Sequence, residues 1–365
     1  MAATQPNGAS AATAQAAAPL PLLKDFCVAV FSAQTYVKDY LEGPLRATVE
    51  PKNLRFIEAR LDSVTAELAH GCQCVCLFVN DNCDAKAVDV LADKGVRFIA
   101  MRCAGFDKVD LEACARRGIR VVRVPAYSPR SVAEHAFALS FALARELHNQ
   151  IPRVKAGNYT LNGIVGIELS FKTYGVVGTG NIGIEMIKLL RCLGGRILAF
   201  DPYPSEEAKS LGAEYVTLEQ LLAESDLVSL HCPLMASTFN LLNAERLQLM
   251  KPSALLINVS RGGLINTNAL LDALERNQLR GAAMDVYENE GNLFDEDFTQ
   301  YASKDRMTKW DRQWTMLKSL PNVIVTPHSA FLTQEALRNI ADTTAENVRD
   351  CASGGTLRNE VLPRK

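Results

Sequence analysis

Three glycines near the middle of the chain carry its most specific chemical signal. Gly178, Gly180 and Gly183 follow the apolar run 174–177 in the order G-x-G-x-x-G. In this order the first glycine allows a tight turn, the second lets backbone approach a pyrophosphate, and the third lets the next helix pack closely on the strand. The amides at the start of that helix point at phosphate oxygens. The motif therefore predicts a nucleotide-binding turn.

The residues after the turn favour one particular nucleotide. Apolar residues recur at helical spacing up to Leu193, and a second apolar strand covers 197–200. Asp201 follows this strand, where an acidic side chain accepts hydrogen bonds from the adenosine ribose. Its charge would repel a 2′-phosphate, and no Arg or Lys lies within 202–205 to receive one. We therefore expect NAD rather than NADP as the cofactor.

Three polar residues downstream could act on a substrate. Arg261 follows a buried-type strand and precedes two glycines, so we place it at the carboxyl end of a parallel strand, where its planar guanidinium can fix a carboxylate. His328 follows the predicted strand VIVTP, residues 323–327, and histidine titrates near neutral pH, as the proton donor in a ketone reduction must. Glu290 could hold the imidazole and raise its pKa, and Glu288 competes for that role. The alternatives are an exposed arginine and a solvated histidine.

Length and charge exclude several classes of protein. The 365 residues are enough for two domains of ordinary size, and the formal net charge is −2. No basic block marks a surface for nucleic acid or an anionic membrane, and no apolar run is long enough to span a bilayer. We expect an enzyme with a small-molecule substrate, and neither nucleic acid nor a membrane as its partner.

The ten cysteines indicate free thiols rather than disulfides or metal ligands. Cys72, Cys74 and Cys76 alternate along a predicted strand, so they share one face in a row and do not converge on a tetrahedral metal ion. We predict no metal site. Many free thiols also favour a reducing compartment.

Strands and helices alternate along two stretches of the chain. Five strands within 26–124 alternate with helical segments such as 85–94 and 109–117, and a second series follows the glycine motif. The pattern predicts an α/β fold with two doubly wound parallel-sheet domains. The amphipathic helix 333–351 needs a sheet to cover, so we expect the C-terminus to return to the first domain. The predicted domains are a flavodoxin-like substrate domain, 24–125 with 325–365, and a Rossmann NAD-binding domain, 126–324.

Residues 1–23 are predicted to form a disordered leader. They are rich in alanine and contain no charged side chain before Lys24. A transit peptide would be rich in arginine and a secretory signal would start with basic residues, so we expect a cytoplasmic protein. The alternative is an organelle stroma or matrix after removal of a presequence.

Two further segments interrupt this regular pattern. Residues 131–150 form a predicted helix that is apolar on more than one face, so it needs more cover than one sheet provides. We expect this helix, with Phe137 and Phe141, to lie in the interface of a homodimer or dimer-based oligomer. The acidic and aromatic stretch 289–320 contains both tryptophans and breaks the alternation of strands and helices.

Seven segments resemble, in order and spacing, those of the D-isomer-specific 2-hydroxyacid dehydrogenases. They are MRCAGFDKVDL, VPAYSPRSVAEHA, GVVGTGNIG, HCPLMAST, INVSRGGLI, GAAMDVYENE and VTPHSAFLT. The resemblance covers nearly the whole chain from Phe26 onward and is closest to the fermentative D-lactate dehydrogenases. It implies a reversible, NADH-dependent reduction of pyruvate to D-lactate by a dimer. The alternatives are glyoxylate, hydroxypyruvate or another 2-keto acid as substrate, or a protein that binds NAD as a sensor.

The resemblance also implies roles for individual residues. Arg261 resembles the family's substrate-carboxylate arginine, His328 its acid/base histidine, and Glu290 the partner of that histidine. The implied substrate-binding residues are Ala104, Gly105, Tyr127, Arg261 and Phe331. The implied cofactor-binding residues are Gly178, Gly180, Asn181, Ile182, Gly183, Asp201, Cys232, Pro233, Thr238, Val259, Ser260 and Asp285. Cys103 adjoins the implied substrate loop, and we predict that its thiol is structural.

Overall fold

The computed structural model describes residues 22–294 and 296–363, which form two compact units. Unit 1 contains the described residues up to Pro125 and those from Ile340 onward, and unit 2 is Ala126–Asn339. Most of the predicted leader, residues 1–21, lies outside the described residues. Leu23 forms a parallel bridge with Val49, so the predicted end of the leader at residue 23 is too late.

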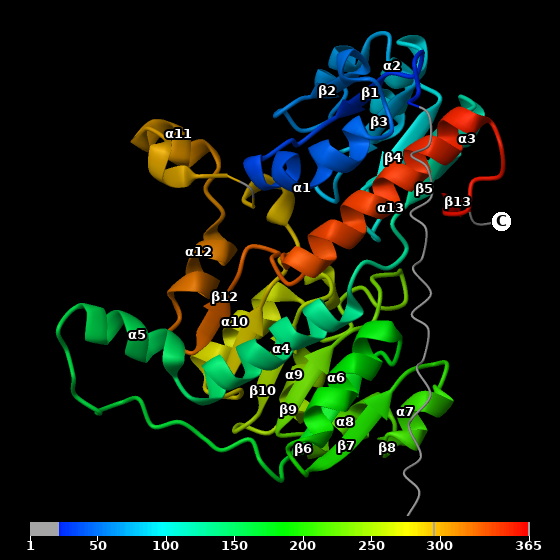
Figure 1. Cartoon of the computed structure of the whole chain (residues 1–365). Coiled ribbons are helices and arrows are strands. Elements are labelled where there is room, and N and C mark those ends of the chain that lie inside the picture. Colours follow the sequence, from blue (N-terminus) through cyan, green and yellow to red (C-terminus); the bar gives the residue numbers. More distant parts are fainter. Residues whose placement is uncertain (1–21, 295, 364–365) are drawn as a thin grey trace, which may run out of the picture. The chain divides into compact units, whose positions relative to one another are not determined.

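Among the described residues, unit 1 is built on a six-stranded sheet (Figure 1). Its strand order is β13-β5-β4-β3-β1-β2, in which only β13 is antiparallel to its neighbour. The strands are β1 (Val28–Val30), β2 (Leu54–Phe56), β3 (Cys74–Leu77), β4 (Phe98–Met101), β5 (Arg120–Arg123) and β13 (Glu360–Val361). The parallel strands have the flavodoxin-like order 2-1-3-4-5, which confirms the predicted fold class of this unit.

Both faces of this sheet are buried, as the uniformly apolar strands require. Helices α1 (Thr35–Arg46) and α13 (Gln334–Ser353) cover one face, where Val37, Leu41 and Val348 pack on alternate strand residues (Figure 1). The strand residues between these, such as Val75, are also buried. They point to the side of α2 (Ala85–Asp93), α3 (Leu111–Arg116) and the short helix η2 (Thr65–Ala69). A further short helix, η1 (Pro51–Asn53), precedes β2.

The cysteines of β3 are small buried side chains. Cys74 and Cys76 pack in the same apolar cluster, so they share one face of the strand as predicted. Burial raises the pKa of the Cys76 thiol to about 11 and that of Cys114 to about 12. All ten cysteines are free, and the described residues contain no group of three His, Cys, Asp or Glu that could hold a metal ion.

Unit 2 is built on a parallel sheet of seven strands among the described residues. The order is β12-β11-β10-β9-β6-β7-β8. The strands are β6 (Thr173–Val177), β7 (Arg196–Phe200), β8 (Ala213–Tyr215), β9 (Leu227–Leu230), β10 (Leu255–Asn258), β11 (Gly281–Met284) and β12 (Val323–Val325). Six of them have the Rossmann order 3-2-1-4-5-6, and β12 extends one edge, which confirms the predicted nucleotide-binding fold.

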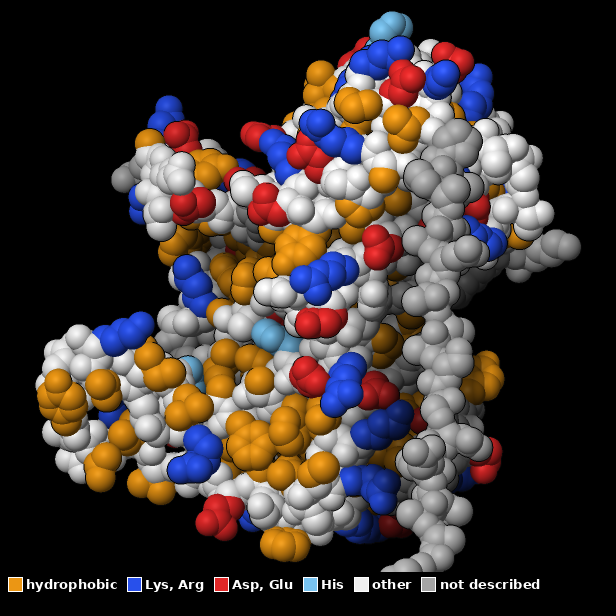
Figure 2. All heavy atoms as spheres, viewed as in Figure 1, with side chains coloured by type: hydrophobic (Ala, Val, Ile, Leu, Met, Phe, Trp, Pro, Cys, Tyr) orange, Lys and Arg blue, Asp and Glu red, His pale blue; other side chains and the backbone are white. Residues whose placement is uncertain are grey.

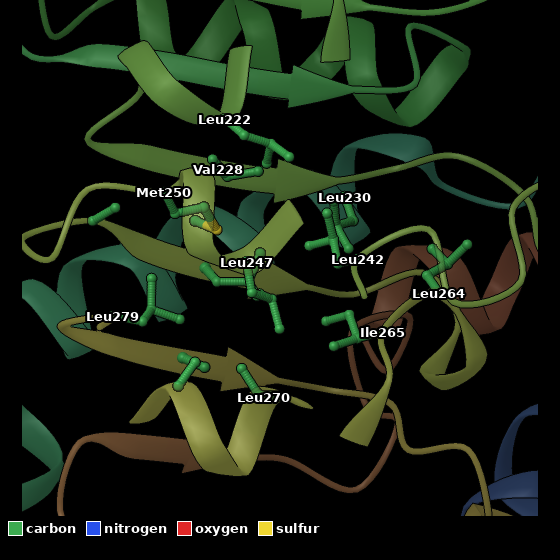
Figure 3. Packing of buried hydrophobic residues seen from close by; sticks show 14 of the residues in the cluster. Leu222, Val228, Leu230, Leu242, Leu247, Met250, Leu264, Ile265, Leu270 and Leu279 are labelled. Carbon is green, nitrogen blue, oxygen red and sulfur yellow. The ribbon is translucent and has the colours of Figure 1, made fainter. Parts of the chain in front are cut away.

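Helices cover both faces of the unit 2 sheet (Figure 1). Helices α4 (Pro129–Ala144) and α6 (Asn181–Arg191) lie side by side on one face. The other face carries α8 (Leu218–Glu224), α9 (Ala244–Leu249) and α10 (Thr267–Glu275). Figure 3 shows this second core, in which Leu222, Leu247 and Leu270 meet strand residues such as Val228. Helix α7 (Glu206–Ser210) packs beside β8.

The predicted helix 131–150 is wrong as a single element. It divides into α4 and α5 (Leu147–Lys155), because Glu146 takes a left-handed conformation with φ 58°. The side chain of Asn149 donates a hydrogen bond to the Glu146 carboxylate, which holds this break. Apolar residues such as Leu147 and Ile151 continue past the break, so hydrophobic spacing alone could not locate it. None of the described helices is long and apolar enough to cross a membrane.

The C-terminal return to unit 1 occurs later than the predicted residue 325. Residues 326–339 belong to unit 2, and α13 begins there and continues into unit 1. The physical reason lies in Asp285 at the end of β11. Its carboxylate accepts hydrogen bonds from the N–H groups of Ser329 and Ala330, which fixes the segment after β12 to this sheet.

The stretch 289–320 is a compact excursion made of short helices. Its elements are η4 (Glu290–Asn292), η5 (Phe298–Gln300), α11 (Ser303–Thr308) and α12 (Arg312–Ser319). A small apolar cluster of Tyr287, Leu293 and Phe294, with Phe298 and Trp314 packed against it, anchors the excursion to the end of β11. The tryptophan at 314 is therefore a packing residue.

Candidate active site

The glycine turn between β6 and α6 has the shape that its sequence predicts. Gly178 has φ 95°, and a Cβ there would lie 2.5 Å from the Cys232 nitrogen; a Cβ on Gly183 would lie 2.0 Å from the Gly178 oxygen. At Gly180, by contrast, no described atom outside its immediate neighbours lies within 4 Å of the Cβ position. Gly180 also caps the eleven-residue α6, whose first amides have no partner within the helix. The turn thus leaves open backbone where a pyrophosphate would bind, and it fits a dinucleotide.

Asp201 lies directly after β7, beside the glycine turn. Its Oδ2 accepts a hydrogen bond of 2.7 Å from the Thr179 N–H, and its Oδ1 accepts one of 2.8 Å from the Tyr203 N–H. These two bonds fix the carboxylate between the first and second strands of the nucleotide fold. This is the position at which an acidic residue accepts the ribose hydroxyls.

Asn181 and Ile182 are the first residues of α6, and the remaining predicted cofactor residues lie on loops after β9, β10 and β11. Ser260 Oγ donates a hydrogen bond of 2.6 Å to the Cys232 carbonyl, which ties the β10 loop to the β9 loop. Thr238 Oγ1 donates to the Pro233 carbonyl at 2.7 Å and holds the β9 loop in a turn. Burial raises the pKa of the Cys232 thiol to about 11. That thiol is therefore neutral near pH 7.

His328 and Glu290 form a hydrogen-bonded pair at the same edge of the sheet. The His328 Nδ1 lies 2.7 Å from Glu290 Oε1, and the two side chains are 18% and 13% exposed. Glu290 begins the short helix η4, and Glu288, its competitor, is exposed. Of the two carboxylates, the structure brings Glu290 to the imidazole. Because Nδ1 faces the carboxylate, Nε2 is the nitrogen available to a substrate.

The backbone of His328 is held in an uncommon conformation. Its φ is 53°, in the left-handed region, and its N–H donates to the Asp285 carbonyl at 2.8 Å. The Asp285 carboxylate is fully buried and accepts from the N–H groups of Ser329 and Ala330, each at 2.9 Å. Asp285 therefore holds the histidine loop on the end of β11. Its implied contact with NAD stays a prediction.

The charge of Asp285 is stabilised by its surroundings. Burial by itself would raise the pKa of this carboxyl. Hydrogen bonds from His135 and Thr326 outweigh burial, and the positive charge of His328 acts in the same direction, so the pKa of Asp285 lies below its ordinary value. A carboxylate at this position is therefore present throughout the neutral range.

Arg261 lies immediately after β10, in the loop that also carries two glycines. Its Nη1 donates a hydrogen bond of 2.8 Å to the Ser260 carbonyl. A Cβ on Gly262 would lie 2.1 Å from the Tyr287 carbonyl carbon and 2.2 Å from the Glu288 nitrogen. The arginine loop therefore packs directly on the chain that leads to Glu290, and Gly262 is the residue that permits this approach.

The structure thus brings together the predicted residues of unit 2. Arg261, Glu290 and His328 lie on loops that follow neighbouring strands, the edge where ligands bind in such sheets. Tyr127 and Phe331 are close to each other, with ring centroids 6.2 Å apart in an edge-to-face arrangement. The other two predicted substrate residues, Ala104 and Gly105, lie in unit 1.

The loop that contains Ala104 and Gly105 follows β4. The Ala104 carbonyl accepts a hydrogen bond of 2.8 Å from Arg123 Nη1, and the Gly105 carbonyl accepts one of 3.2 Å from Cys103 Sγ. Both carbonyls are therefore engaged within unit 1. Cys103 is buried and holds the loop from inside.

Sequence reasoning missed the residues that hold the reactive side chains in place. Thr326 Oγ1 donates a hydrogen bond to Asp285, and His135 Nε2 lies 3.5 Å from the same carboxylate. Tyr287 contacts Glu290 through its backbone: its N–H donates to Glu290 Oε2 at 3.1 Å. Thr326 and Tyr287 lie within three residues of a predicted site residue. That short spacing is the signal that could have found them.

A nucleotide turn, an arginine and a histidine–carboxylate pair on one Rossmann sheet define a class, the nicotinamide-dependent dehydrogenases. A family model described as the D-isomer specific 2-hydroxyacid dehydrogenase, NAD binding domain, matches residues 137–330. The chain therefore belongs to the D-isomer-specific 2-hydroxyacid dehydrogenases. It is an NAD-dependent oxidoreductase, as the sequence predicts.

Individual relatives are similar over nearly the whole chain. The D-lactate dehydrogenase of Escherichia coli is 42% identical over 92% of this chain and 99% of its own length. The solved structure of the pyruvate reductase of Chlamydomonas reinhardtii is 50% identical, covers 92% of this chain and 99% of its own, and has a TM-score of 0.86. The NAD-complexed D-isomer specific 2-hydroxyacid dehydrogenase of Lactobacillus delbrueckii ssp. bulgaricus is 29% identical, covers 93% and 100%, and has a TM-score of 0.73.

Proposed function

We propose that this enzyme reduces pyruvate to D-lactate with NADH, and that the reaction is reversible. The observation that carries the proposal is the His328–Glu290 pair, 2.7 Å apart and mostly buried, on the edge that also carries the Arg261 loop. The pyruvate reductase of Chlamydomonas reinhardtii and the D-lactate dehydrogenase of Escherichia coli, both similar over nearly the whole chain, support pyruvate as the keto acid.

Arg261 and His328 divide the work on the keto acid. The Arg261 guanidinium is a planar fork that pairs with the substrate carboxylate and orients the adjacent carbonyl. Bound NADH supplies the hydride that C2 receives. His328 Nε2 donates a proton to the substrate oxygen, and Glu290 stabilises the imidazolium before the transfer. In the oxidation direction the neutral imidazole accepts that proton instead.

The remaining predicted residues would shape the substrate site. Tyr127 and Phe331 supply an aromatic wall beside the reacting carbon, and such a wall limits the size of the 2-keto acid side chain. The resemblance also implies that Ala104 and Gly105, in unit 1, bind the substrate, and their role stays a prediction. These residues would orient the substrate, whereas the hydride would come from the bound cofactor.

A steady-state assay tests this function. NADH oxidation is followed with pyruvate, glyoxylate, hydroxypyruvate and bulkier 2-keto acids, and the product from pyruvate is resolved on a chiral column. We expect the highest kcat/KM with pyruvate and only the D isomer as product. A higher kcat/KM with another keto acid would reassign the substrate. NADH binding without turnover of any of these acids would favour an NAD sensor.

We also propose that the enzyme is a homodimer that associates through the arm around α5. The arm, residues 147–165, carries exposed apolar side chains that its own unit does not cover. They include Leu147, Ile151, Val154, Tyr159, Leu161 and Val165. Figure 2 shows hydrophobic side chains gathered over this part of unit 2. Exposed apolar surface of this extent is typical of a protein–protein interface.

Light scattering of charged variants tests the dimer. Phe137 and Phe141 of α4 pack against the core of their own unit, so charges there would disturb folding as well as association. Ile151→Asp and Leu161→Asp change exposed residues instead. We expect these two variants to shift the mass from dimer to monomer and to keep the wild-type circular dichroism spectrum. Dimers of unchanged stability would disprove the arm interface.

We propose that the enzyme works in the cytoplasm, a reducing compartment, and its ten free cysteines support this placement. Fractionation of the source cells, with an antibody against the C-terminus, tests the proposal. Recovery with the stroma or matrix, in a form shortened at the N-terminus, would instead indicate an organelle protein with a cleaved presequence.

A further inference from the structure

The carboxylate that holds His328 is itself held by one tyrosine. The backbone N–H of Tyr287 donates to Glu290 Oε2 at 3.1 Å, and the Tyr287 carbonyl accepts from the Glu290 N–H at 3.3 Å. Glu290 thus binds His328 through one oxygen and Tyr287 through the other. The position of the acid/base pair therefore depends on where the backbone at 287 lies.

The side chain of Tyr287 is fastened at its far end to the excursion 289–320. Its hydroxyl donates to the Asp311 carboxylate, with distances of 3.0 Å to Oδ1 and 2.9 Å to Oδ2. Asp311 Oδ1 also accepts from the Trp314 N–H at 2.9 Å, as the N-cap of α12. Burial, followed by the bond to Asp311 and its negative charge, raises the pKa of the Tyr287 phenol, so the phenol remains a neutral donor.

The ring of Tyr287 is buried between these two ends. It lies 5.2 Å from the Trp314 ring, which in turn packs on the ring of Phe294 at 5.3 Å. Packing of this kind fixes the ring plane, and the bond to Asp311 fixes how far the ring extends. The tyrosine is therefore held at its backbone, along its ring and at its hydroxyl.

The same stretch of backbone also supports the arginine loop. The peptide between Tyr287 and Glu288 lies against Gly262, where a Cβ would come within 2.2 Å of it. A displacement of Tyr287 would therefore move the peptide against which Gly262, the residue after Arg261, packs. Tyr287 is the point at which the supports of the arginine loop and of the histidine–carboxylate pair meet.

We propose that Tyr287 and Asp311 are positioning residues for the reaction, and that the excursion 289–320 serves to clamp Glu290 against His328. The inference rests on the proposed acid/base function of His328. It assigns to the excursion a function that its sequence did not reveal. The part of the excursion around Asp311 acts on Glu290, at the start of the excursion, through one phenol hydrogen bond, and neither Tyr287 nor Asp311 needs to touch the substrate.

Three variants test the clamp. Tyr287→Phe keeps the buried ring and removes the hydroxyl, Asp311→Ala removes the acceptor, and Asp311→Asn keeps both an acceptor and a helix cap. We expect about a tenfold fall in kcat for the first two, because small misplacements of reacting groups have large kinetic costs. Asp311→Asn should recover most of the rate. In Tyr287→Phe, the pH at which the reduction rate falls by half should move down, since Glu290 then supports the imidazolium less well.

Tyr301→Phe is the matched control within the same excursion. The Tyr301 hydroxyl also donates to a carboxylate, that of Glu296, which in turn binds Lys309 at 2.9 Å. We expect kcat and the pH profile of Tyr301→Phe to match the wild type. If Tyr287→Phe behaves like Tyr301→Phe, or lowers Tm without moving the pH profile, the clamp is disproved.

An NMR titration separates this proposal from the proposed function. The His328 imidazole signal, assigned by its loss in His328→Gln, is followed against pH in wild type, Tyr287→Phe and Tyr301→Phe. The measurement needs no turnover. A lower titration midpoint in Tyr287→Phe alone supports the clamp even if no 2-keto acid is reduced. Equal midpoints in all three proteins overturn it even if pyruvate is the substrate.

Discussion

The carboxyl edges of the two sheets carry similar polar residues and use them differently. In unit 1, Asp81 and Arg102 are 1% and 3% exposed. The Asp81 carboxylate accepts bonds of 2.6 to 2.7 Å from Ser32 Oγ and from the N–H groups of Leu61 and Phe78. Arg102 Nη1 and Nη2 donate to the carbonyls of Phe31 and Ser32, at 3.0 and 2.9 Å. Both buried side chains thus hold loops of their own unit in place.

The corresponding edge of unit 2 keeps part of its polar surface free for a ligand. Glu290 and His328 remain 13% and 18% exposed, and the backbone at Gly180 faces open space. Both sheets collect polar groups where parallel strands end. The difference shows that a reactive edge needs a glycine turn that leaves room and side chains whose hydrogen bonds are only partly satisfied from within.

The largest effect is expected at the reactive edge. His328→Gln should lower kcat by roughly 10²- to 10⁴-fold, the usual contribution of a positioned general acid. The reduction rate of the wild type should fall as pH rises and the oxidation rate should rise, because the two directions need opposite protonation states of the imidazole. NADH binding, followed by fluorescence, should survive. Wild-type turnover in His328→Gln would show that the proton comes from another group.

A mutation at the structural edge should instead change stability. Asp81→Ala leaves two buried N–H groups and one hydroxyl without their acceptor, at a cost of about 1 kcal/mol or more for each, and so roughly 3 kcal/mol in the free energy of unfolding. Urea unfolding measures this loss, and kcat per folded molecule should be unchanged. A variant of normal stability with poor turnover would contradict the distinction between the two edges.

The edge of unit 2 also contains a histidine that does no proton transfer in the folded state. Burial lowers the pKa of His231 to about 3, and its Nε2 lies 2.8 Å from Ser229 Oγ. Below pH 6.5 His231 binds a proton in the unfolded chain but stays neutral in the folded chain. The free energy of unfolding therefore falls as the pH falls from 6.5 to 3. Between pH 7 and pH 5 the free energy of unfolding of the wild type should fall by about 2 kcal/mol more than that of His231→Gln. Parallel stability curves for the two proteins would refute this.

Cofactor selection should depend on one charge at this edge. Asp201→Ser removes a carboxylate whose repulsion of a 2′-phosphate amounts to roughly 1 kcal/mol in water, so NADPH use relative to NADH should rise about fivefold or more. Asp201→Asn is the control that keeps an acceptor for the Thr179 N–H. The ratio of kcat/KM for the two cofactors is the measurement. An unchanged ratio in both variants would place selectivity elsewhere.

The smallest effect is expected at Cys103 in unit 1. Its thiol is buried and bonds to the Gly105 carbonyl at 3.2 Å, and a serine hydroxyl can make the same bond. Cys103→Ser should therefore keep turnover within about twofold of the wild type, since a neutral hydrogen bond contributes only about 1 kcal/mol. Loss of nearly all activity in a folded Cys103→Ser protein would assign this thiol to the chemistry.

Features with a local chemical cause could be predicted from the sequence. The order G-x-G-x-x-G fixed the turn because Gly178 and Gly183 admit no Cβ, and the alternation of apolar strands with helices gave both sheets. The strand β8, AEY, could not be predicted, because it is short and has only one aliphatic residue. The break at Glu146 could not be predicted, because it depends on the left-handed backbone of a single residue between two helices.

The supports of the site depend on contacts between distant segments, which no local pattern encodes. Tyr287 meets Asp311 across 24 residues, and Thr326 meets Asp285 across 41. The end of unit 2 at residue 339 rather than 324 has the same origin. Two backbone bonds to Asp285 hold the chain on the sheet beyond β12.

The left-handed backbone at His328 restricts which mutations can reach this position during evolution or a directed search. Its φ of 53° is a conformation that few side chains adopt readily, apart from glycine, asparagine, aspartate and histidine itself. A β-branched residue there would strain the loop as well as remove the imidazole. A saturation library at codon 328, sorted for folded protein alone, should therefore return mainly those four residues. Few residues at this position would therefore be available to selection for catalysis. Of these, histidine is the one whose ordinary pKa suits proton transfer near neutral pH.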